Sequence, residues 1–354
     1  MKTEKVFFKK SKVIPIDKFF SNVLYDKKLG YYNSKIPFGK EGDFVTSPKI
    51  SNIFSEIIAI WMISCWETFG RPQNLNIVEL GPGDGSLTKI LLRTFKKFPE
   101  FNSIKKLFLF EKSIYLKKIQ KKNILDKGVK WIDNFDKLKK GPIIFFGNEF
   151  FDALPIKQFK KIYNSLYEKN YTLNQKFEIE EVFRKASQQD KKMIENFKTI
   201  KKLKFIEFPK LGFNELKKIS KKISELQGCI LIIDYGYLKP NNQNTLQSVI
   251  KHKKNKLLNN LGKADITAHV NFALLSEFFI KNNLKIKNII TQKNFLESMG
   301  ILERAKIIAK KMKFTEQTDL YLRIQRLLSP KYMGNLFKVI LAYNFKDNNF
   351  TGFK

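Results

Sequence analysis

Apolar positions between residues 75 and 150 form short continuous runs, and stretches with helix-like spacing of apolar residues separate them. An apolar run of four to eight residues between polar turns is typical of a strand buried on both faces. The predicted strands are 75–80, 105–111, 128–133 and 142–150, and the predicted helices between them are 86–97 and 113–122. This alternation predicts a parallel, doubly wound α/β sheet.

The pattern changes after Pro155. Residues 156–184 read as strands joined by polar turns, which predicts a β-rich insertion. The run "GCILIIDYG" (228–236) resumes the buried strands, and "LKIKNII" and "NLFKVILAY" (335–343) are expected to close the sheet. Between these runs, the pattern predicts helices at 212–226, 271–281 and 294–329 and a polar loop at 237–262.

The first 70 residues contain two predicted helices, 14–27 and 50–69, joined by a long loop rich in Gly, Pro and aromatic residues. Loops of this length are usually functional or disordered, and the aromatic residues argue against disorder. No clean domain boundary appears. We divide the chain into an N-terminal helical segment with its loop (1–70), the first part of a core (71–155), an insertion (156–227) and the remainder of the core with a helical insertion (228–354).

Composition limits the class of protein. The chain has 354 residues, of which 43% are apolar, enough for a sizeable core. No stretch offers the ~20 uninterrupted apolar residues that a membrane span needs, so we expect no membrane insertion. The apolar run at the N-terminus is too short for a signal peptide, and Glu4 weakens a transit-peptide interpretation. A cytoplasmic location is therefore expected, or a mitochondrial one in a eukaryote.

The formal net charge of +34 suggests nucleic-acid binding, because basic surfaces attract phosphate. The lysines are, however, scattered along the chain rather than gathered into one stripe, and we expect no stable nucleic-acid complex. Cys65 and Cys229 lie in apolar runs and are expected to be buried small side chains. No Cys/His cluster has zinc-ligand spacing, so no metal is expected.

The stretch "VELGPGDGSL" (78–87) follows the first predicted core strand and opens a helix. A dinucleotide fold would have its third glycine at position 86, but here Gly81 and Gly83 are followed by Gly85. The spacing E-x-G-x-G-x-G is typical of S-adenosylmethionine-dependent methyltransferases, in which the glycines let the backbone approach the cofactor closely. Glu79 is expected to act from beneath this turn, through backbone or water.

Two acids at strand ends support a methyl-donor site. Glu111 ends the second predicted core strand, where a carboxylate can accept both ribose hydroxyls. Asp133 ends the third, where an acid commonly meets the adenine amine. Together with the glycine spacing, these acids make S-adenosylmethionine the expected cofactor.

The residues after the fourth core strand indicate the acceptor. Nucleic-acid amine methyltransferases carry N-P-P-Y or N-L-P-Y there, whereas this chain reads "NEFFDALP" (148–155). The carboxylate of Glu149 suits a guanidinium, whose N–H donors match a carboxylate bidentately. Asp152 offers a second carboxylate, although both acids could instead cap a helix or pair with basic neighbours. The resemblance of "ELGPGDGSLT" to ribosomal RNA adenine dimethylases keeps RNA methylation as an alternative.

Several blocks together resemble the MidA-like family of arginine methyltransferases, whose mitochondrial members are complex I assembly factors. They occur in family order and cover nearly the whole chain beyond its first residues. The blocks are "LGYY" (29–32), "GDFVTSP" (42–48), "VELGPGDGSL" (78–87), "NEFFDALPIKQF" (148–159), "IDYGY" (233–237), "TLQSVIKH" (245–252), "ADITAHVNF" (264–272), "TQKNFLESMGILER" (291–304) and "MGNLFKV" (333–339).

The resemblance implies a Rossmann-like, seven-stranded class I methyltransferase sheet with an inserted β-rich and helical substrate region. It also implies symmetric dimethylation of a protein arginine; in mitochondria the substrate is a 49-kDa-type subunit of complex I. A homodimer and a non-catalytic assembly role stay open. The cofactor site implied is Gly42, Asp43, Phe44, Thr46, Ser47, Glu79, Gly81, Gly83, Gly85, Glu111, Asp133 and Asn148, and the catalytic residues are Glu149, Asp152 and His269.

Two positions depart from the family pattern. Lys49 stands where the family usually has Glu, and Asn271 where it usually has Asp. In the block "ADITAHVNF", Asp265, Thr267 and His269 could contribute to catalysis, or Asp265 or Thr267 could cap the following helix. We favour the capping role. A carboxylate or His269 is expected to take the final proton.

Overall fold

The computed structural model describes residues 4–35, 37–39 and 42–353. The chain divides into two compact units, each made from three stretches. Unit 1 comprises residues 1–44, 151–217 and 237–278, and unit 2 comprises 45–150, 218–236 and 279–354. In this division, residues 1–44 and 237–278 join residues 151–217 in one unit.

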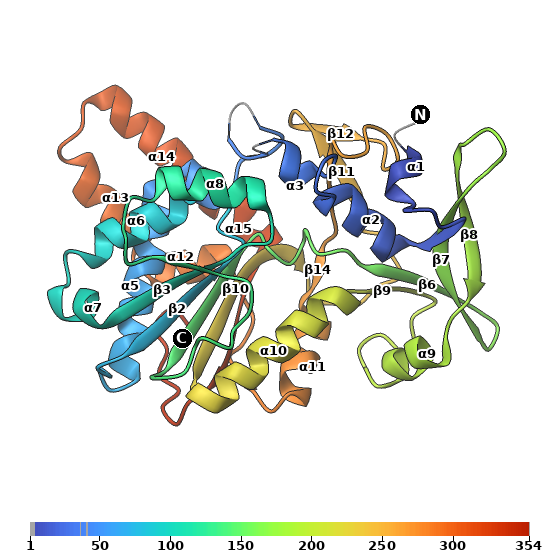
Figure 1. Cartoon of the computed structure of the whole chain (residues 1–354). Helices are drawn as coiled ribbons and strands as arrows, with labels where there is room; N and C mark the ends of the chain where they lie inside the picture. Colours follow the sequence, from blue (N-terminus) through green and yellow to red (C-terminus); the bar gives the residue numbers. More distant parts are fainter. Residues whose placement is uncertain (1–3, 36, 40–41, 354) are drawn as a thin grey trace. The chain divides into compact units, whose positions relative to one another are not determined.

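Unit 2 contains a mostly parallel sheet, shown in Figure 1. Its strands lie in the order β15-β17-β10-β5-β2-β3-β4, with β16 also paired to β17. The strands from β4 to β10 run parallel, and β17 is antiparallel to β10. The bounds are β2 Leu75–Leu80, β3 Lys105–Phe110, β4 Lys130–Ile132, β5 Ile143–Asn148, β10 Gly228–Tyr237, β15 Lys285–Ile286, β16 Ile290–Thr291 and β17 Phe337–Asn344. This confirms the predicted α/β fold class.

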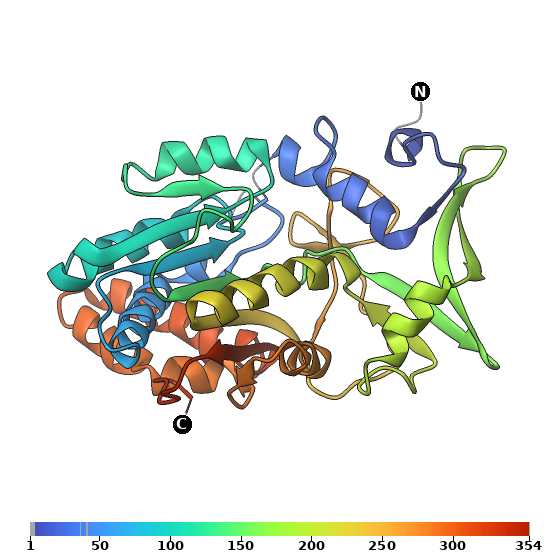
Figure 2. The ribbon, with the colours of Figure 1, turned by 60° about the horizontal axis from the view of Figure 1, so that its bottom comes forward.

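Helices pack on the sheet because each strand alternates its side chains between two faces. On one face, Ile77, Ile144 and Leu231 join the apolar core formed with α5 (Asn52–Thr68) and α6 (Ser86–Phe95). Figure 2 shows α10 (Lys210–Leu226), in yellow, running alongside the strands. The remaining helices with residues in this unit are α4 Ser47–Ile50, α7 Pro99–Ile104, α8 Ile114–Asn123, α11 Phe272–Lys281, α12 Gln292–Ser298, α13 Ile301–Ala309, α14 Phe314–Leu328 and α15 Met333–Leu336.

The core also takes up both cysteines. Cys65 and Cys229 are free and buried, which confirms the prediction for these residues. The pKa of the Cys65 thiol lies well above its ordinary value because the thiol is buried beside Cys229.

Within the described ranges, none of the helices combines the length and the apolar character needed to cross a membrane.

Unit 1 is built around a second, antiparallel sheet in the order β1-β7-β6-β9, with β8 paired to β7. Helix α2 (Ile16–Tyr25) contributes Phe19 and Phe20, whose rings contact Tyr171 of β7 edge-on. The bounds of the other elements are α1 Glu4–Phe7, α3 Tyr31–Ser34, α9 Gln188–Glu195, β1 Val13–Pro15, β6 Lys157–Ile162, β7 Ser165–Leu173, β8 Ile179–Lys185, β9 Phe205–Phe208 and β14 Val270–Asn271. Strands β6 to β8 confirm the predicted β-rich insertion.

The prediction of a loop at 237–262 was wrong in part. A three-stranded sheet in the order β12-β11-β13 runs through this region, with β11 at Gln247–Ile250, β12 at Lys253–Asn255 and β13 at Asp265–Thr267. These strands are short and mostly polar, and they are held by pairing with each other rather than by an alternating apolar pattern. A hydrophobicity pattern therefore carries little signal for them.

Candidate functional site

The glycine turn between β2 and α6 has three residues in the left-handed region. The φ angles are 62° at Gly81, 59° at Gly83 and 83° at Gly85, a conformation that glycine adopts without a steric penalty. A Cβ at Gly81 would lie 2.5 Å from the ring of Phe150, and a Cβ at Gly85 would lie 2.8 Å from Ile124. The early third glycine is therefore required by the backbone conformation and by close packing.

Helix α8 holds this turn from one side. The Gln120 amide donates hydrogen bonds to the carbonyl of Gly83 (2.8 Å) and to the carboxylate of Glu111 (3.1 Å). The Asn123 amide donates to the carbonyl of Asp84 at 2.9 Å. One buried amide thus joins the glycine turn to the acid at the end of β3.

Glu111 lies at the end of β3 and is buried. Its carboxylate also accepts a hydrogen bond from the backbone N–H of Ser113 at 2.7 Å. Burial raises the pKa of Glu111, and the bonds from Ser113 and Gln120 oppose that rise. The backbone N–H of Lys112 donates to this carboxylate as well, and because an ionised carboxylate has about four acceptor positions, capacity remains for a hydroxyl group of a ligand.

Glu79 lies in β2 beneath the glycine turn. It is buried, and the Thr88 hydroxyl of α6 donates a hydrogen bond to its carboxylate. Burial raises the pKa of Glu79 to about 7, despite the hydrogen bond from Thr88. Glu79 therefore joins β2 to α6, and its predicted action on the cofactor through backbone or water stays a prediction.

Lys49, one of the two departures from the family pattern, lies in α4. Its ammonium forms an ion pair with Asp84 of the glycine turn. The Asp84 carboxylate also accepts a hydrogen bond from the backbone N–H of Ser86 at 3.1 Å. In this chain the residue after "TSP" therefore contacts the glycine turn directly.

Glu149 follows β5 with a φ of 51°, in the left-handed region that is uncommon for residues other than glycine. Such backbone strain is concentrated at functional sites. Its backbone N–H donates to the carbonyl of Ile233 in β10 (2.9 Å). Its Oε1 accepts hydrogen bonds from the backbone N–H of Ser47 and the side chain of Asn148, both at 3.0 Å. The carboxylate is thus held in place by neighbouring backbone and side-chain groups.

Ser47 is fully buried where the predicted lid loop enters α4. Its hydroxyl donates to the side-chain oxygen of Gln292 at 3.4 Å, and the Gln292 amide donates to the carbonyl of Leu327 at 3.0 Å. Thr46 and Ser47 belong to unit 2 with the glycine turn, whereas Gly42, Asp43 and Phe44 belong to unit 1. Their predicted contact with the cofactor stays a prediction.

Asp43 is buried within unit 1. Its carboxylate accepts hydrogen bonds from the Tyr31 hydroxyl and the backbone N–H of Lys251, both at 2.7 Å, and pairs with Lys35. Burial acts to raise its pKa, but these donors outweigh that effect and lower it. Asp43 therefore joins the "GDFVTSP" block to the "TLQSVIKH" block.

Asp152 and Asp265 form a second acidic group in unit 1, and both are buried. The carbonyl of Asp152 accepts the backbone N–H of Ala268 at 2.9 Å, and the Tyr32 hydroxyl donates to Asp265 at 3.2 Å. Burial raises the pKa of Asp265 to about 8, and the charge of Asp152 adds to the rise. The "NEFFDALP" and "ADITAHVNF" blocks, far apart in sequence, thus meet in space.

His269 is half-buried and lines a small cavity of unit 1 with Glu207, Tyr237 and Asn271. Burial lowers its pKa, which favours the neutral imidazole. Its backbone N–H donates to the Thr245 hydroxyl at 3.1 Å. The Glu207 carboxylate, which sequence reasoning did not single out, accepts hydrogen bonds from Thr245 and Gln158 and organises this cavity.

The expected capping role of Asp265 or Thr267 was wrong. Both residues lie in β13, and the Asn271 side chain instead accepts a hydrogen bond from the backbone N–H of Leu274 at 3.0 Å in the first turn of α11.

Asp133 is exposed and pairs with Lys117. Its predicted contact with adenine, like the cofactor role of Asn148, stays a prediction.

A family profile and curated relatives match this chain. The profile, described as putative S-adenosyl-L-methionine-dependent methyltransferase, matches residues 57–290. The Xenopus laevis protein named "Protein arginine methyltransferase NDUFAF7, mitochondrial" is 29% identical over 350 residues, covering 92% of this chain and 80% of the relative. The human protein of the same name is 27% identical over 351 residues, covering 92% and 78%.

Solved structures with this fold include a likely methyl transferase from Burkholderia thailandensis, described as a COG1565 superfamily member bound to S-adenosyl-homocysteine. It superposes with a TM-score of 0.83 at 20% identity, covering 99% of this chain and 92% of that chain. A second structure from the same organism gives a TM-score of 0.81 at 20% identity. These likenesses show that this chain has the same fold as the two solved structures.

Proposed function

Because the chain belongs to the family of putative S-adenosyl-L-methionine-dependent methyltransferases, we propose that it transfers methyl groups from S-adenosylmethionine to an arginine of a protein. The observation that carries the choice of acceptor is the fixed carboxylate of Glu149 after β5. Relatives that match most of the chain are named protein arginine methyltransferases, which supports the same choice.

The residues of unit 2 fit the cofactor. We assign its binding to the glycine turn at Gly81, Gly83 and Gly85 and to the carboxylate of Glu111, with Glu79 supporting the turn. The buried Glu111 carboxylate retains acceptor capacity for ribose hydroxyls. When bound, S-adenosylmethionine supplies an electrophilic methyl group on its sulfonium.

Glu149 is proposed to bind the guanidinium of the acceptor. An ionised carboxylate forms charge-assisted hydrogen bonds to a guanidinium and fixes the orientation of its plane. The bonds from Ser47 and Asn148 hold the carboxylate before the acceptor arrives, so little ordering is needed on binding. Much of the acceleration would come from this positioning.

One proton leaves the guanidinium when its nitrogen gains a methyl group. We propose that it passes to a carboxylate, that of Glu149 or Asp152, or to His269. The lowered pKa of His269 keeps its imidazole neutral at physiological pH, so that it can accept a proton. The raised pKa of Asp265 leaves that carboxyl largely protonated near neutral pH and unsuited to the role.

The acceptor protein is proposed to be a subunit of a complex I-type assembly, with symmetric dimethylarginine as product. A homodimer is also part of this proposal. The relatives named above carry the word "mitochondrial" in their names, which supports a mitochondrial location where the host is a eukaryote. They lend no support to a cytoplasmic one.

The test is incubation of the purified chain with methyl-labelled donor and either total protein or total RNA of the host. We expect label in protein, released as methylated arginine on acid hydrolysis. Label in RNA alone would overturn the choice of acceptor. A titration with S-adenosylhomocysteine that shows no binding would favour a non-catalytic assembly role.

A further inference from the structure

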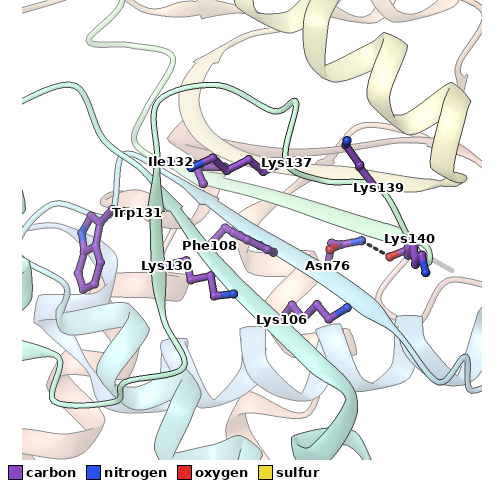
Figure 3. A pocket seen from close by; sticks show the side chains of 9 residues that line it. All are labelled: Asn76, Lys106, Phe108, Lys130, Trp131, Ile132, Lys137, Lys139 and Lys140. Carbon is purple, nitrogen blue, oxygen red and sulfur yellow. Dashed lines mark hydrogen bonds between the residues drawn. The ribbon is translucent and has the colours of Figure 1, made fainter.

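A lysine-lined pocket lies in unit 2, away from the residues assigned to the cofactor. It has a volume of about 590 Å³, within the range of small-molecule sites. Its walls carry Lys106, Lys130, Lys137, Lys139 and Lys140 (Figure 3). The lining contains no acidic side chain. This concentration of charge differs from the scatter of lysines along the sequence.

The pocket lies toward the amino ends of the parallel strands, whereas the glycine turn and Glu111 follow their carboxyl ends. Asn76 of β2 is the Cα partner of Lys106 in β3, and Phe108 is the partner of Lys130 in β4. The lining extends along β4 as far as Ile132, the Cα partner of Phe110, which comes one residue before Glu111. The lining shares no residue with those that we assign to the cofactor.

The wall opposite the strands is a fixed segment. Phe135 packs on Phe110 and Phe145 of the sheet, which anchors the middle of the loop before β5. The Asn76 amide, almost fully buried, donates to the carbonyl of Lys140 at 2.8 Å, as the dashed line in Figure 3 marks. Gly141, with a φ of 82°, approaches Asn74 so closely that a Cβ would lie 2.1 Å from its carbonyl oxygen. These contacts fix the backbone of the loop that carries Lys137, Lys139 and Lys140.

The lysine side chains are available to a ligand. All five lysines are exposed. Across the described part of the chain, none of them forms an ion pair with a carboxylate, and Lys106 donates only to the side chain of Asn74 at 2.8 Å. Asp133, an acid in the same loop, is occupied by Lys117. Although Asp136 also lies in this loop, no acid is among the described residues that line the pocket itself.

We propose that this pocket binds phosphate groups of a nucleoside phosphate, presented either by a free nucleotide or by a nucleic-acid strand. Ammonium groups bind phosphate as point charges, whereas planar carboxylates are matched better by arginine, which the pocket lacks. Phe108 and Ile132 form an apolar floor, which suits the face of a base, whereas the Trp131 indole donates to the side-chain oxygen of Gln120 in α8. This proposal does not rest on arginine methylation.

The test is equilibrium binding to the whole chain, with three probes: ATP, a short fluorescein-labelled single-stranded RNA and a polyglutamate peptide. The variant Lys106→Gln/Lys130→Gln/Lys139→Gln removes charge from the pocket. Lys306→Gln/Lys310→Gln/Lys311→Gln, three exposed lysines in and just after α13, is the matched control with the same net charge. We expect the pocket variant to weaken binding of ATP or RNA by at least about tenfold and the control by less than about threefold.

The two phosphate probes identify the source of the ligand. Tight binding of ATP points to free nucleotides, and tight binding of RNA alone points to a strand; in the RNA case, the slope of log K against log salt falls by about two in the pocket variant. Equal weakening in both variants, no binding of either phosphate probe, or polyglutamate binding as tight as that of the phosphates would overturn the proposal. Unchanged affinity for S-adenosylhomocysteine shows that the variant is folded.

Discussion

The Glu149 carboxylate accepts a hydrogen bond from the backbone N–H of Ser47 at 3.0 Å, across 102 residues of sequence. This bond joins the entrance of α4 to the turn after β5. It gives the acid a fixed position before any acceptor binds. The consequence for catalysis can be tested by removing the charge while keeping the bond.

Glu149→Gln retains an oxygen that can accept from Ser47 but loses the charge proposed to bind guanidinium. We expect kcat/KM for a protein acceptor to fall by about 100-fold or more, because charge-assisted hydrogen bonds are roughly twice as strong as neutral ones and act here on the reacting group. Affinity for S-adenosylhomocysteine should stay within about twofold. The measurements are transfer of labelled methyl groups and calorimetric titration.

Glu195→Gln, on the exposed face of α9, is the matched control for loss of one carboxylate. It should leave both quantities unchanged. Full activity of Glu149→Gln would remove the role that we assign to Glu149.

Glu79 makes stability depend on pH. Its pKa is about 7 in the folded chain against an ordinary value of 4.5. The folded state therefore holds a proton that the unfolded state releases, and stability is lost as pH rises between these values. Glu79→Gln should remove this pH dependence. Between pH 4 and pH 8, the free energy of unfolding should therefore fall by about 3 kcal/mol more in the wild type than in the variant.

Urea denaturation at several pH values measures this difference. Glu67→Gln, an exposed change on α5, is the control and should keep the wild-type pH dependence. Parallel curves for wild type and Glu79→Gln would contradict the raised pKa.

Lys49 compensates the charge of Asp84 in the glycine turn. Lys49→Glu, which restores the residue usual in the family, would place two carboxylates together and should weaken S-adenosylhomocysteine binding more than Lys49→Gln does. We expect a loss of about threefold for Gln and about tenfold or more for Glu at low salt, with the gap narrowing at high salt. Calorimetric titration at two salt concentrations provides the check.

The double variant Lys49→Glu/Asp84→Lys reverses the pair and should recover part of the affinity lost in Lys49→Glu. If Lys49→Glu binds as tightly as the wild type, the ion pair plays no part in holding the turn.

Asn271 caps α11. Asn271→Ala should lower the free energy of unfolding by about 1 kcal/mol, and Asn271→Asp should cost less than about 0.5 kcal/mol because both Asn and Asp are good N-cap residues. The control Asn335→Ala, at an exposed position, should change stability by less than about 0.5 kcal/mol. Equal effects of the two alanine changes, measured by urea denaturation, would argue against the cap.

The sheet could be predicted from the sequence because its strands are buried on both faces. The prediction of a strand at 75–80 agrees with β2, in which all six side chains are buried. The short strands β11 and β12 could not be found in this way, since their polar residues are held by pairing alone. The same limit applies to β15 and β16, two-residue strands where one longer closing strand was expected.

For the site, the types of residue were predictable but their partners were not. The glycine spacing led to the turn, and the charge of Glu149 suggested its proposed role. Nothing local in the sequence indicates that Ser47 would bond to Glu149, or that Gln120 would join Gly83 to Glu111. Such contacts depend on how distant segments pack, which hydrophobic periodicity does not encode.

The strand β17 has a consequence for biosynthesis. It comes later in the chain than every other described strand, yet it lies inside the sheet, between β10 and β15. The chain also passes between the two units five times, so no contiguous fragment consists of one complete unit alone. In a nascent chain, one side of β10 therefore stays without its partner strand until β17 has been made, and during that interval the chain would benefit most from a chaperone.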